Sequence, residues 1–295
     1  MSNDEFKIRP LANRDECEAC VELQQNIWGR DFVDVVPATI LIVSQRIGGV
    51  ASGAFDPSGQ LVGFVFGISG ILDRVGVHWS DMLAVRPHAR RRGLARRLKL
   101  HQREVLLAAG IKKAYWSFDP LVARNARFNL VTLGASPVEY VPDMYGNTAS
   151  VLHQGLDTDR LVVEWRLTEP AVERALAGEP KHLPKAALTG PVVPIHPTRI
   201  NTTPLPRVPW IRLELPADVE QLKTTALESA RHWQLGLRRA FTTYLNEGHA
   251  RVVGMYRDNT TKRCFYAVDT TARETVPTRD STLDMSGTLK PKGLR

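Results

Sequence analysis

The stretch from Met82 to Arg103 joins an apolar strand to a strongly basic helix through a tight turn, and it constrains the fold more than any other segment. The strand Met82-Leu83-Ala84-Val85 runs into Pro87, and Arg90-Arg91-Arg92-Gly93 then leads into the helix. Such a junction points several backbone N–H groups and the positive end of the helix dipole at one place. A phosphate group fits that place, and Gly93 lets the backbone approach it without a Cβ. We expect a phosphate or pyrophosphate site here, the alternative being the solvated start of a basic helix.

This segment also accounts for the net charge of +8. Its basic residues carry no acid between them, and they are Arg86, Arg90, Arg91, Arg92, Arg96, Arg97, Lys99 and Arg103. A local positive surface suits a polyphosphate cofactor, an acidic substrate or a nucleic acid. Nucleic acid is the least favoured of the three, because the chain shows neither interleaved exposed aromatic residues nor a known nucleic-acid-reading motif.

Apolar periodicity and turn residues divide the chain into strands and helices. The expected strands are 6–11, 50–55, 60–68, 77–85, 113–118, 135–141 and 160–167, and the expected helices are 14–28, 38–47, 93–109 and 124–133. Strands and helices alternate irregularly, which predicts an α+β fold (α/β layered) with a mixed, mostly antiparallel sheet flanked by helices.

The length of 295 residues suggests more than one domain. We expect a first domain over 1–168, a Pro-rich extended connector over 169–209, a β-α-β-β unit over 210–270 and a polar, disordered tail over 271–295. The β-α-β-β unit is short, so its apolar faces should pack either on the first domain or on a second subunit, which would give a homodimer.

Three motifs carry a resemblance to a known family. Val85-x-Pro87 precedes Arg90-x-x-Gly93-x-Ala95, and a later helix ends in Leu133-Gly134-Ala135. Together with the element order, these motifs resemble the GNAT superfamily of N-acetyltransferases over about residues 5–168. Segments 28–37, 118–121 and 124–126 resemble a bacterial subgroup with a C-terminal extension.

The resemblance implies an acyl-CoA-dependent N-acyltransferase. Its donor would be acetyl-CoA or another acyl-CoA, and its acceptor a small amine or an amino acid. The alternative is a non-catalytic CoA-binding or regulatory protein, since fold alone does not fix function.

The resemblance also implies where coenzyme A lies. In the family, the strands matching 82–85 and 114–118 splay apart around the pantetheine arm, and the basic turn holds the pyrophosphate. The residues implied for donor binding are Leu83, Ala84, Val85, Arg90, Arg91, Arg92, Gly93, Leu94, Ala95, Arg96 and Asn125. For Asn125, capping the N-terminus of its helix is an equal alternative.

Two residues are candidates for the general base. Asp81 sits where many family members have an acid, and a period of two places it on the same face as Leu83 and Val85. Burial would raise its pKa to a useful value, whereas a solvent-facing Asp at the strand end is the alternative. His78 is the second candidate because its ordinary pKa is near neutrality, and the subgroup often has a histidine at the position of Asp81.

The usual general acid of the family, a tyrosine, is replaced here by Leu130. Tyr145 and Tyr140 are the nearby alternatives, unless both serve packing. Water can also protonate a leaving thiolate, so the replacement does not exclude activity.

The acceptor is expected near the first two helices, with Trp28, Arg30 and Phe32 as contacts and Asp31 beside them. Arg30 could clamp the carboxylate of an amino acid, or it could form a surface ion pair with Asp31 or Asp34. Trp116 and Phe118 alternate along one strand, which is typical of core residues.

Cys17, Cys20 and Cys264 are expected to be reduced structural thiols, because Cys17-x-x-Cys20 has no second pair to complete a metal site. The N-terminus lacks the regions of a signal peptide, and no apolar run is long enough to span a bilayer. We therefore expect a cytoplasmic protein without a membrane partner.

Overall fold

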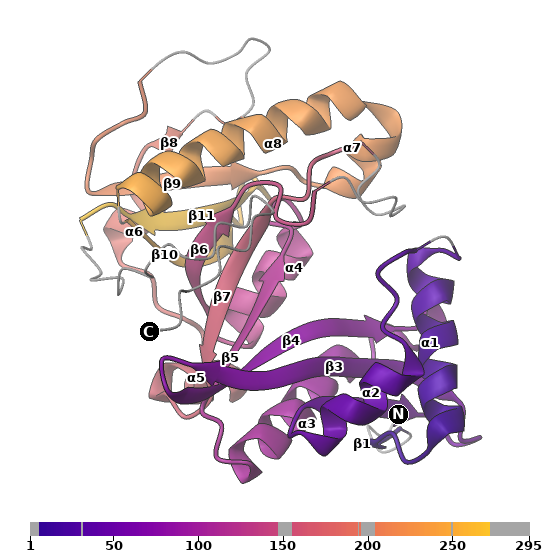
Figure 1. Cartoon of the computed structure of the whole chain (residues 1–295). Coiled ribbons are helices and arrows are strands. Elements are labelled where there is room, and N and C mark those ends of the chain that lie inside the picture. The colour runs from indigo at the N-terminus through magenta and orange to yellow at the C-terminus, as the bar shows by residue number, and fades with distance from the viewer. Residues whose placement is uncertain are drawn as a thin grey trace, which may run out of the picture.

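The computed structural model describes residues 6–30, 32–146, 155–193, 195, 204–248 and 250–271. These residues form two β-sheets flanked by helices (Figure 1). The larger sheet belongs to the first part of the chain, and the smaller sheet, covered by a long helix, belongs to the last part.

The larger sheet has the strand order β1-β2-β3-β4-β5-β7-β6. Its strands are β1 (Lys7–Pro10), β2 (Val50–Phe55), β3 (Leu61–Leu72), β4 (Val75–Val85), β5 (Lys113–Phe118), β6 (Ser136–Val141) and β7 (Arg160–Arg166). All neighbouring pairs are antiparallel except β4 and β5. The predicted fold class, a mixed and mostly antiparallel sheet flanked by helices, is confirmed.

Helices cover both faces of this sheet. On one face lie α1 (Arg14–Trp28) and α2 (Ala38–Arg46), whose apolar side chains share a core with those of β2 and β3. On the other lie α3 (Leu94–Ala108), α4 (Ala123–Arg127) and the π-helical turn η2 (Phe128–Thr132). The predicted helix 124–133 is therefore a short α-helix that widens into a π turn.

The starts and ends of these helices follow from local chemistry. The side chain of Asn13 caps α1 by accepting a hydrogen bond from the Glu16 N–H, at 2.9 Å. Pro37 precedes α2 with the fixed φ that suits a helix start, and Gly110, at φ +76°, follows the last turn of α3.

The C-terminal unit has the predicted β-α-β-β order, with a broken helix. Its elements are β9 (Trp210–Leu215), α7 (Val219–Thr225), α8 (Leu227–Phe241), the π-helical turn η3 (Thr242–Glu247), β10 (Arg251–Arg257) and β11 (Cys264–Asp269). Ala226 leaves the helical conformation, with φ −156° and ψ 61°, and so separates α7 from α8. The single helix expected in this unit is therefore divided into two.

The expectation of an extended connector over 169–209 is also wrong in its described part. Two short helices, α5 (Pro170–Leu176) and α6 (Lys185–Thr189), form there, and β8 (Val192–Val193) joins the smaller sheet in the order β10-β11-β9-β8. Val172 and Val193 are buried, so this segment contributes to the core. The expected tail lies outside the described residues from 272 onward.

The C-terminal unit packs on the first domain, one of the two alternatives expected. Tyr140 of β6 lies 5.2 Å from Phe241 of α8, measured between ring centroids. The Tyr266 hydroxyl donates a hydrogen bond to the Pro120 carbonyl, at 2.7 Å. Both units share one continuous core, in which β5, β6 and β7 lie between the two ends of the molecule (Figure 1).

Candidate active site

Strands β4 and β5 pair over only a short length and then part. Their register consists of His78 opposite Ala114 and Trp79 opposite Tyr115, although β4 continues to Val85 and β5 to Phe118. The backbone N–H and C=O groups that these two strands direct toward each other beyond Trp79 are left without a ladder partner. The splay implied by the family resemblance is therefore present, at the place where an extended ligand can pair with β4.

A β-bulge lies at this point of β4. Phe66 of β3 is opposite Met82 and Gly67 is opposite Ser80, so Asp81 is the inserted residue. A bulge of one residue reverses the alternation of side chains along a strand. Before the bulge, Ser80 bonds with residues of α3, and after it, Met82 packs in the α1–α2 core.

The bulge overturns the prediction that Asp81 shares a face with Leu83 and Val85. Those two side chains pack with the core that includes α3. Asp81 instead accepts a hydrogen bond from the Trp79 side chain and lies near Asp34, in the loop between α1 and α2. Its carboxyl is thus on the α1–α2 side of the sheet.

The surroundings of Asp81 favour the role of a base. Partial burial raises its pKa, and the Asp34 carboxylate raises it further, while the hydrogen bond from Trp79 acts in the opposite direction. Asp81 is nevertheless solvent-exposed, so a ligand can reach it, and this exposure agrees with the alternative of a solvent-facing Asp.

His78 is fully buried, with both ring nitrogens engaged. The Lys99 ammonium is a donor only, so the Gln102 atom that lies 2.7 Å from it is the oxygen Oε1. The amide nitrogen of Gln102 therefore faces His78 and donates to its Nε2, at 3.0 Å. His78 Nδ1 then carries the proton and donates to Ser69, whose hydroxyl donates to the Gly48 carbonyl. Burial lowers the pKa of His78 to about 3. This buried, neutral imidazole has no exposed surface for a ligand to reach, and its hydrogen bonds link the sheet to α3.

Lys99 lies in the same buried network, beneath the point where β4 and β5 part. Its Nζ donates to Ser80 Oγ at 2.9 Å and sits 3.8 Å from the centre of the Trp116 ring. Desolvation lowers the pKa of Lys99 to about 7. The burial of this ammonium therefore costs stability at neutral and acid pH.

This burial predicts a pH-dependent stability. The unfolded chain holds the Lys99 proton up to about pH 10.5, and the folded chain loses it near pH 7, so this residue makes the free energy of unfolding rise between those values. The rise is at most about 1.4 kcal/mol per pH unit. The free energy of unfolding of wild type minus that of Lys99→Met, measured by urea unfolding from pH 6 to 10, should therefore become more positive as the pH rises. The exposed Lys112→Met is the matched control, and parallel profiles for wild type and Lys99→Met would contradict the assignment.

The turn after β4 has the geometry of an anion site. The 3-10 turn η1 (Pro87–Ala89) is followed by Arg91 at φ +64° and Gly93 at φ +72°. The Arg97 N–H bonds to the Gly93 carbonyl at 3.0 Å as the helix begins, so the N–H groups of the residues between them have no intrahelical acceptor. They point out of the N-terminus of α3, as the sequence predicted.

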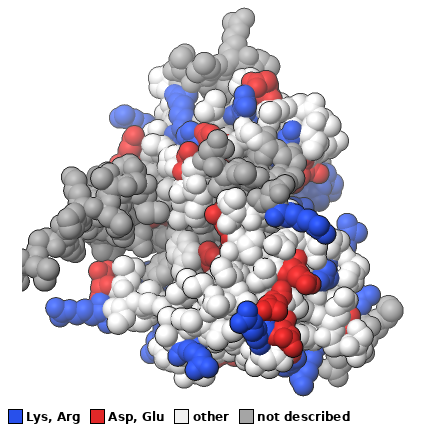
Figure 2. Space-filling model, turned by 45° about the vertical axis from the view of Figure 1, so that its right-hand side comes forward, with Lys and Arg blue, Asp and Glu red and all other residues white. Residues whose placement is uncertain are grey.

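Much of the basic charge in this segment has a structural task instead. Five guanidinium groups donate to main-chain carbonyls: Arg86 to Leu61, Arg90 to Val85, Arg96 to Leu176, Arg97 to Phe6 and Arg103 to Leu167. Lys99 is buried as well, so the local positive surface expected from this segment does not include all eight basic residues. On the face that Figure 2 shows, Lys and Arg side chains are scattered, and acidic side chains gather in a group among them.

Tyr145 lies across the splay from Asp81. Its hydroxyl is 3.0 Å from Ser117 Oγ on β5, and its ring is 5.3 Å from the Arg160 guanidinium carbon. The neighbours of Ser117 on β5, Trp116 and Phe118, are core residues as predicted, so Ser117 points to the opposite side of the sheet, where Asp81 also lies. Tyr145 is 45% exposed and accessible to a ligand.

The other tyrosine considered is not accessible. Tyr140 is buried, and its hydroxyl donates to Asp159 Oδ2 at 2.5 Å. Burial and the adjacent carboxylate raise its pKa far above the ordinary value. Leu130, at the family's tyrosine position, is also buried.

Asn125 and the expected acceptor contacts occupy less specific places. Asn125 is half-buried within α4, whose N-cap is Val122, so the capping alternative for Asn125 is wrong. Trp28 is half-buried and its ring centroid lies 5.5 Å from that of Phe32. Arg30 is exposed, and Asp31 lies outside the described residues.

Sequence reasoning missed several residues of the site, among them Trp79, Asp34 and Ser117. Alternation along β5 was a usable signal for Ser117, because it places this polar residue opposite the buried Trp116. No local signal identified Asp34, which reaches the site only through the fold.

Comparisons with known proteins gave matches among solved structures alone. No protein-family model matches the chain, and no curated protein matches it. Among solved structures, it is similar to yncA of Salmonella typhimurium, described as an acetyltransferase and solved with acetyl-CoA (17% identity, TM-score 0.45, 56% of this chain and 96% of that one).

Two further solved structures are similar to the same extent. One is the ribosomal-protein-S18-alanine N-acetyltransferase of Escherichia coli (17% identity, TM-score 0.43, 56% of this chain and 95% of that one). The other is NAA60 of Arabidopsis thaliana with a bisubstrate analogue (16% identity, TM-score 0.42, 54% of this chain and 98% of that one). Each match covers just over half of this chain.

Within the described ranges, no helix combines the length and the apolar character needed to cross a membrane.

Proposed function

We propose that this protein is a GNAT-type, acyl-CoA-dependent N-acyltransferase that moves an acetyl or other acyl group directly from coenzyme A to a small amine or amino acid, in the cytoplasm. The observation that carries the proposal is the parting of β4 from β5 directly before the turn that opens α3. The parting leaves strand backbone free for an extended amide-containing arm, and the turn presents N–H groups for a pyrophosphate.

In this proposal the donor binds along β4. The N–H and C=O groups of Leu83 and the N–H of Val85, which the β4–β5 ladder does not use, pair with the amides of the pantetheine arm and polarise the thioester carbonyl, whereas the Val85 carbonyl accepts from Arg90. The N–H groups between Gly93 and Arg97 hold the pyrophosphate, and Arg91 and Arg92, on the exposed side of the turn, add positive charge. Arg90 and Arg96 hold the turn through the main chain instead.

The transfer needs three proton movements, which the two sides of the splay supply. Asp81 takes one proton of the acceptor ammonium, and the free amine nitrogen attacks the thioester carbon. The C–N bond forms and the C–S bond breaks, the Tyr145 hydroxyl gives its proton to the departing thiolate, and the second proton of the nitrogen returns to the Tyr145 oxygen through solvent. Trp28, Phe32 and Arg30 are the proposed contacts of the acceptor.

A non-catalytic CoA-binding protein is the second candidate, and Leu130 at the family's tyrosine position favours it. The two candidates share donor binding and differ in turnover. Release of free coenzyme A in the presence of an amine therefore separates them.

Calorimetric titration with CoA, acetyl-CoA and succinyl-CoA tests the proposal. We expect saturable binding and a preference among the acyl groups. A screen of the standard amino acids, simple primary amines and polyamines should then give thiol release with at least one acceptor. Binding without release would favour the second candidate, and no binding would refute both.

A further inference from the structure

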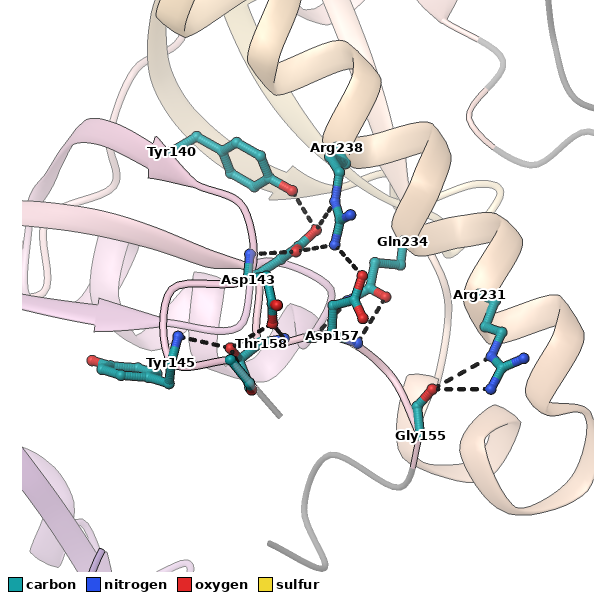
Figure 3. A network of polar contacts seen from close by, with 11 residues as sticks. Tyr140, Asp143, Tyr145, Gly155, Asp157, Thr158, Arg231, Gln234 and Arg238 are labelled. Atoms are coloured by element: carbon teal, nitrogen blue, oxygen red, sulfur yellow. Dashed lines mark hydrogen bonds and ion pairs between the residues drawn. The ribbon is translucent and has the colours of Figure 1, made fainter. Parts of the chain in front are cut away.

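The turn that carries Tyr145 is held by the strand-like segment leading into β7. The Tyr145 N–H donates to Thr158 Oγ1 at 2.8 Å, and the Met144 N–H donates to the Thr158 carbonyl at 3.1 Å. Thr158 in turn donates its own N–H to Asp143 Oδ1 at 3.0 Å. These bonds fix the main chain of the turn, as Figure 3 shows, while the Tyr145 ring points away from α8.

The segment around Thr158 is clamped from the C-terminal unit. Arg238 of α8 donates through Nε to Asp159 Oδ2 at 3.0 Å and through Nη2 to Asp159 Oδ1 at 2.5 Å. The same guanidinium reaches Asp157 Oδ2 at 2.7 Å, and the Gln234 amide bonds the main chain of Asp157 on both sides. Two residues of α8 therefore hold both neighbours of Thr158 (Figure 3).

Asp159 joins this clamp to the turn. Its Oδ1 accepts a hydrogen bond from the Asp143 N–H at 3.0 Å as well as from Arg238. Its side chain is 4% exposed, so removal of Arg238 would leave a buried carboxylate without its ion-pair partner. Such a carboxylate must move or become protonated, and either change alters the turn.

Packing alone does not hold Tyr145 in place. The ring is 45% exposed, its hydroxyl contacts the Ser117 hydroxyl, and its face contacts the Arg160 guanidinium. The position of its hydroxyl over β5 is therefore set mainly by the main chain of the turn. That main chain depends on Thr158 and Asp159, and these depend on α8.

We propose that Arg238 is a positioning residue of the acyl transfer, and that the C-terminal unit completes the active site by holding the Tyr145 hydroxyl beside Ser117. This inference rests on the proposed function, because it assigns a task to Tyr145 in that reaction. It goes further by giving the C-terminal unit a part in catalysis that is separate from donor binding.

The first arm of the test measures the turn without any ligand. Hydrogen exchange of the full chain, read by mass spectrometry on peptides containing residues 143–146, compares wild type with Arg238→Ala and Arg238→Lys. Exchange at the Met144 and Tyr145 amides should accelerate about tenfold or more in Arg238→Ala, because these N–H groups lose stable acceptors. Arg263→Ala is the matched control, since it breaks an Arg–Glu214 ion pair in the same unit away from the turn. Unchanged exchange in Arg238→Ala would overturn the proposal.

The second arm measures transfer from the acyl-CoA that binds best to the amine that the screen ranks first. Arg238→Ala should lower kcat by about 100-fold, with donor affinity within about twofold of wild type. Arg238→Lys should recover part of that loss, and Arg263→Ala should leave kcat unchanged. Tyr145→Phe should lower kcat similarly. The double variant Arg238→Ala with Tyr145→Phe should have a kcat little lower than either single variant, because both substitutions act through the Tyr145 hydroxyl.

The two arms separate the possible failures. Wild-type transfer with an unaffected kcat in Arg238→Ala, or additive losses in the double variant, would overturn the positioning role alone. Wild type that binds no acyl-CoA, or transfers to no amine, would overturn the proposed function and this role together, whatever the exchange data show. Loss of donor binding in Arg238→Ala would instead indicate general disruption and also refute the proposal.

Discussion

Asp81→Asn is expected to lower the acylation rate by about 100- to 1000-fold while leaving the affinity for acyl-CoA within about twofold of wild type. The reason is that the asparagine amide keeps the shape of the side chain and its place in the bulge but cannot accept the acceptor's proton. Steady-state thiol release, together with calorimetric titration of the donor, measures both quantities.

The pH profile makes this prediction sharper. Because the pKa of Asp81 is raised, the wild-type rate should fall on the acid side at a higher pH than an ordinary aspartate would give. Asp34→Asn should move that limb to lower pH, since it removes the carboxylate that raises the pKa of Asp81 further. A wild-type rate in Asp81→Asn from pH 6 to 9 would remove Asp81 as the base.

Stability provides the control for Asp81→Asn. A raised pKa means that the folded chain holds this proton more tightly than the unfolded chain does, so ionised Asp81 destabilises the fold above its pKa. The asparagine variant should therefore have a melting temperature equal to or above that of wild type at neutral pH. A lower melting temperature would show that the rate loss comes from damage to the bulge.

Gly93→Val is expected to weaken acyl-CoA binding by more than about 100-fold. Gly93 has φ +72°, and a Cβ there would meet open space, so the glycine is needed for its backbone conformation rather than for room. A β-branched residue disfavours this conformation and would turn the following N–H groups away from the pyrophosphate. The loss of two hydrogen bonds to a charged group, at about 1.5–3 kcal/mol each, gives the expected magnitude.

Gly59→Val is the matched control for this variant. Gly59 has φ +83°, and its Cβ would also meet open space, but it lies in the turn between β2 and β3. Both variants should lose a similar amount of stability, and only Gly93→Val should lose donor binding, as read by calorimetry. Equal affinities in the two variants would refute the donor site.

The parts of the fold that were predictable are those with a local signal. Period-two and period-3.6 apolar patterns located the strands and helices of the first domain, and Gly93 with the preceding arginines located the turn that opens α3. The bulge at Asp81 has no such signal, because one inserted residue leaves the sequence pattern intact. It changes only the side of the sheet to which the later side chains of β4 point. Its detection needed the register of β3 against β4.

The contacts of the arginines, and those that hold the turn of the proposed general acid Tyr145, also had no local signal in the sequence. A run of arginines in the sequence does not show that Arg96 reaches Leu176 and Arg97 reaches Phe6, because those carbonyls arrive from distant segments. The link from Arg238 to the turn of Tyr145 is equally distant along the chain. Pro-rich composition was misleading over 169–209, where buried Val172 and Val193 show that burial in the common core outweighed it.

The shared core of the two units has a consequence for how the protein is made. Synthesis from the N-terminus produces the proposed donor-binding strand and turn well before Arg238. The turn of Tyr145 gains its clamp only after α8 has been made and has packed against the first domain. On the proposed function, competence for transfer would therefore be gained only at that stage of translation.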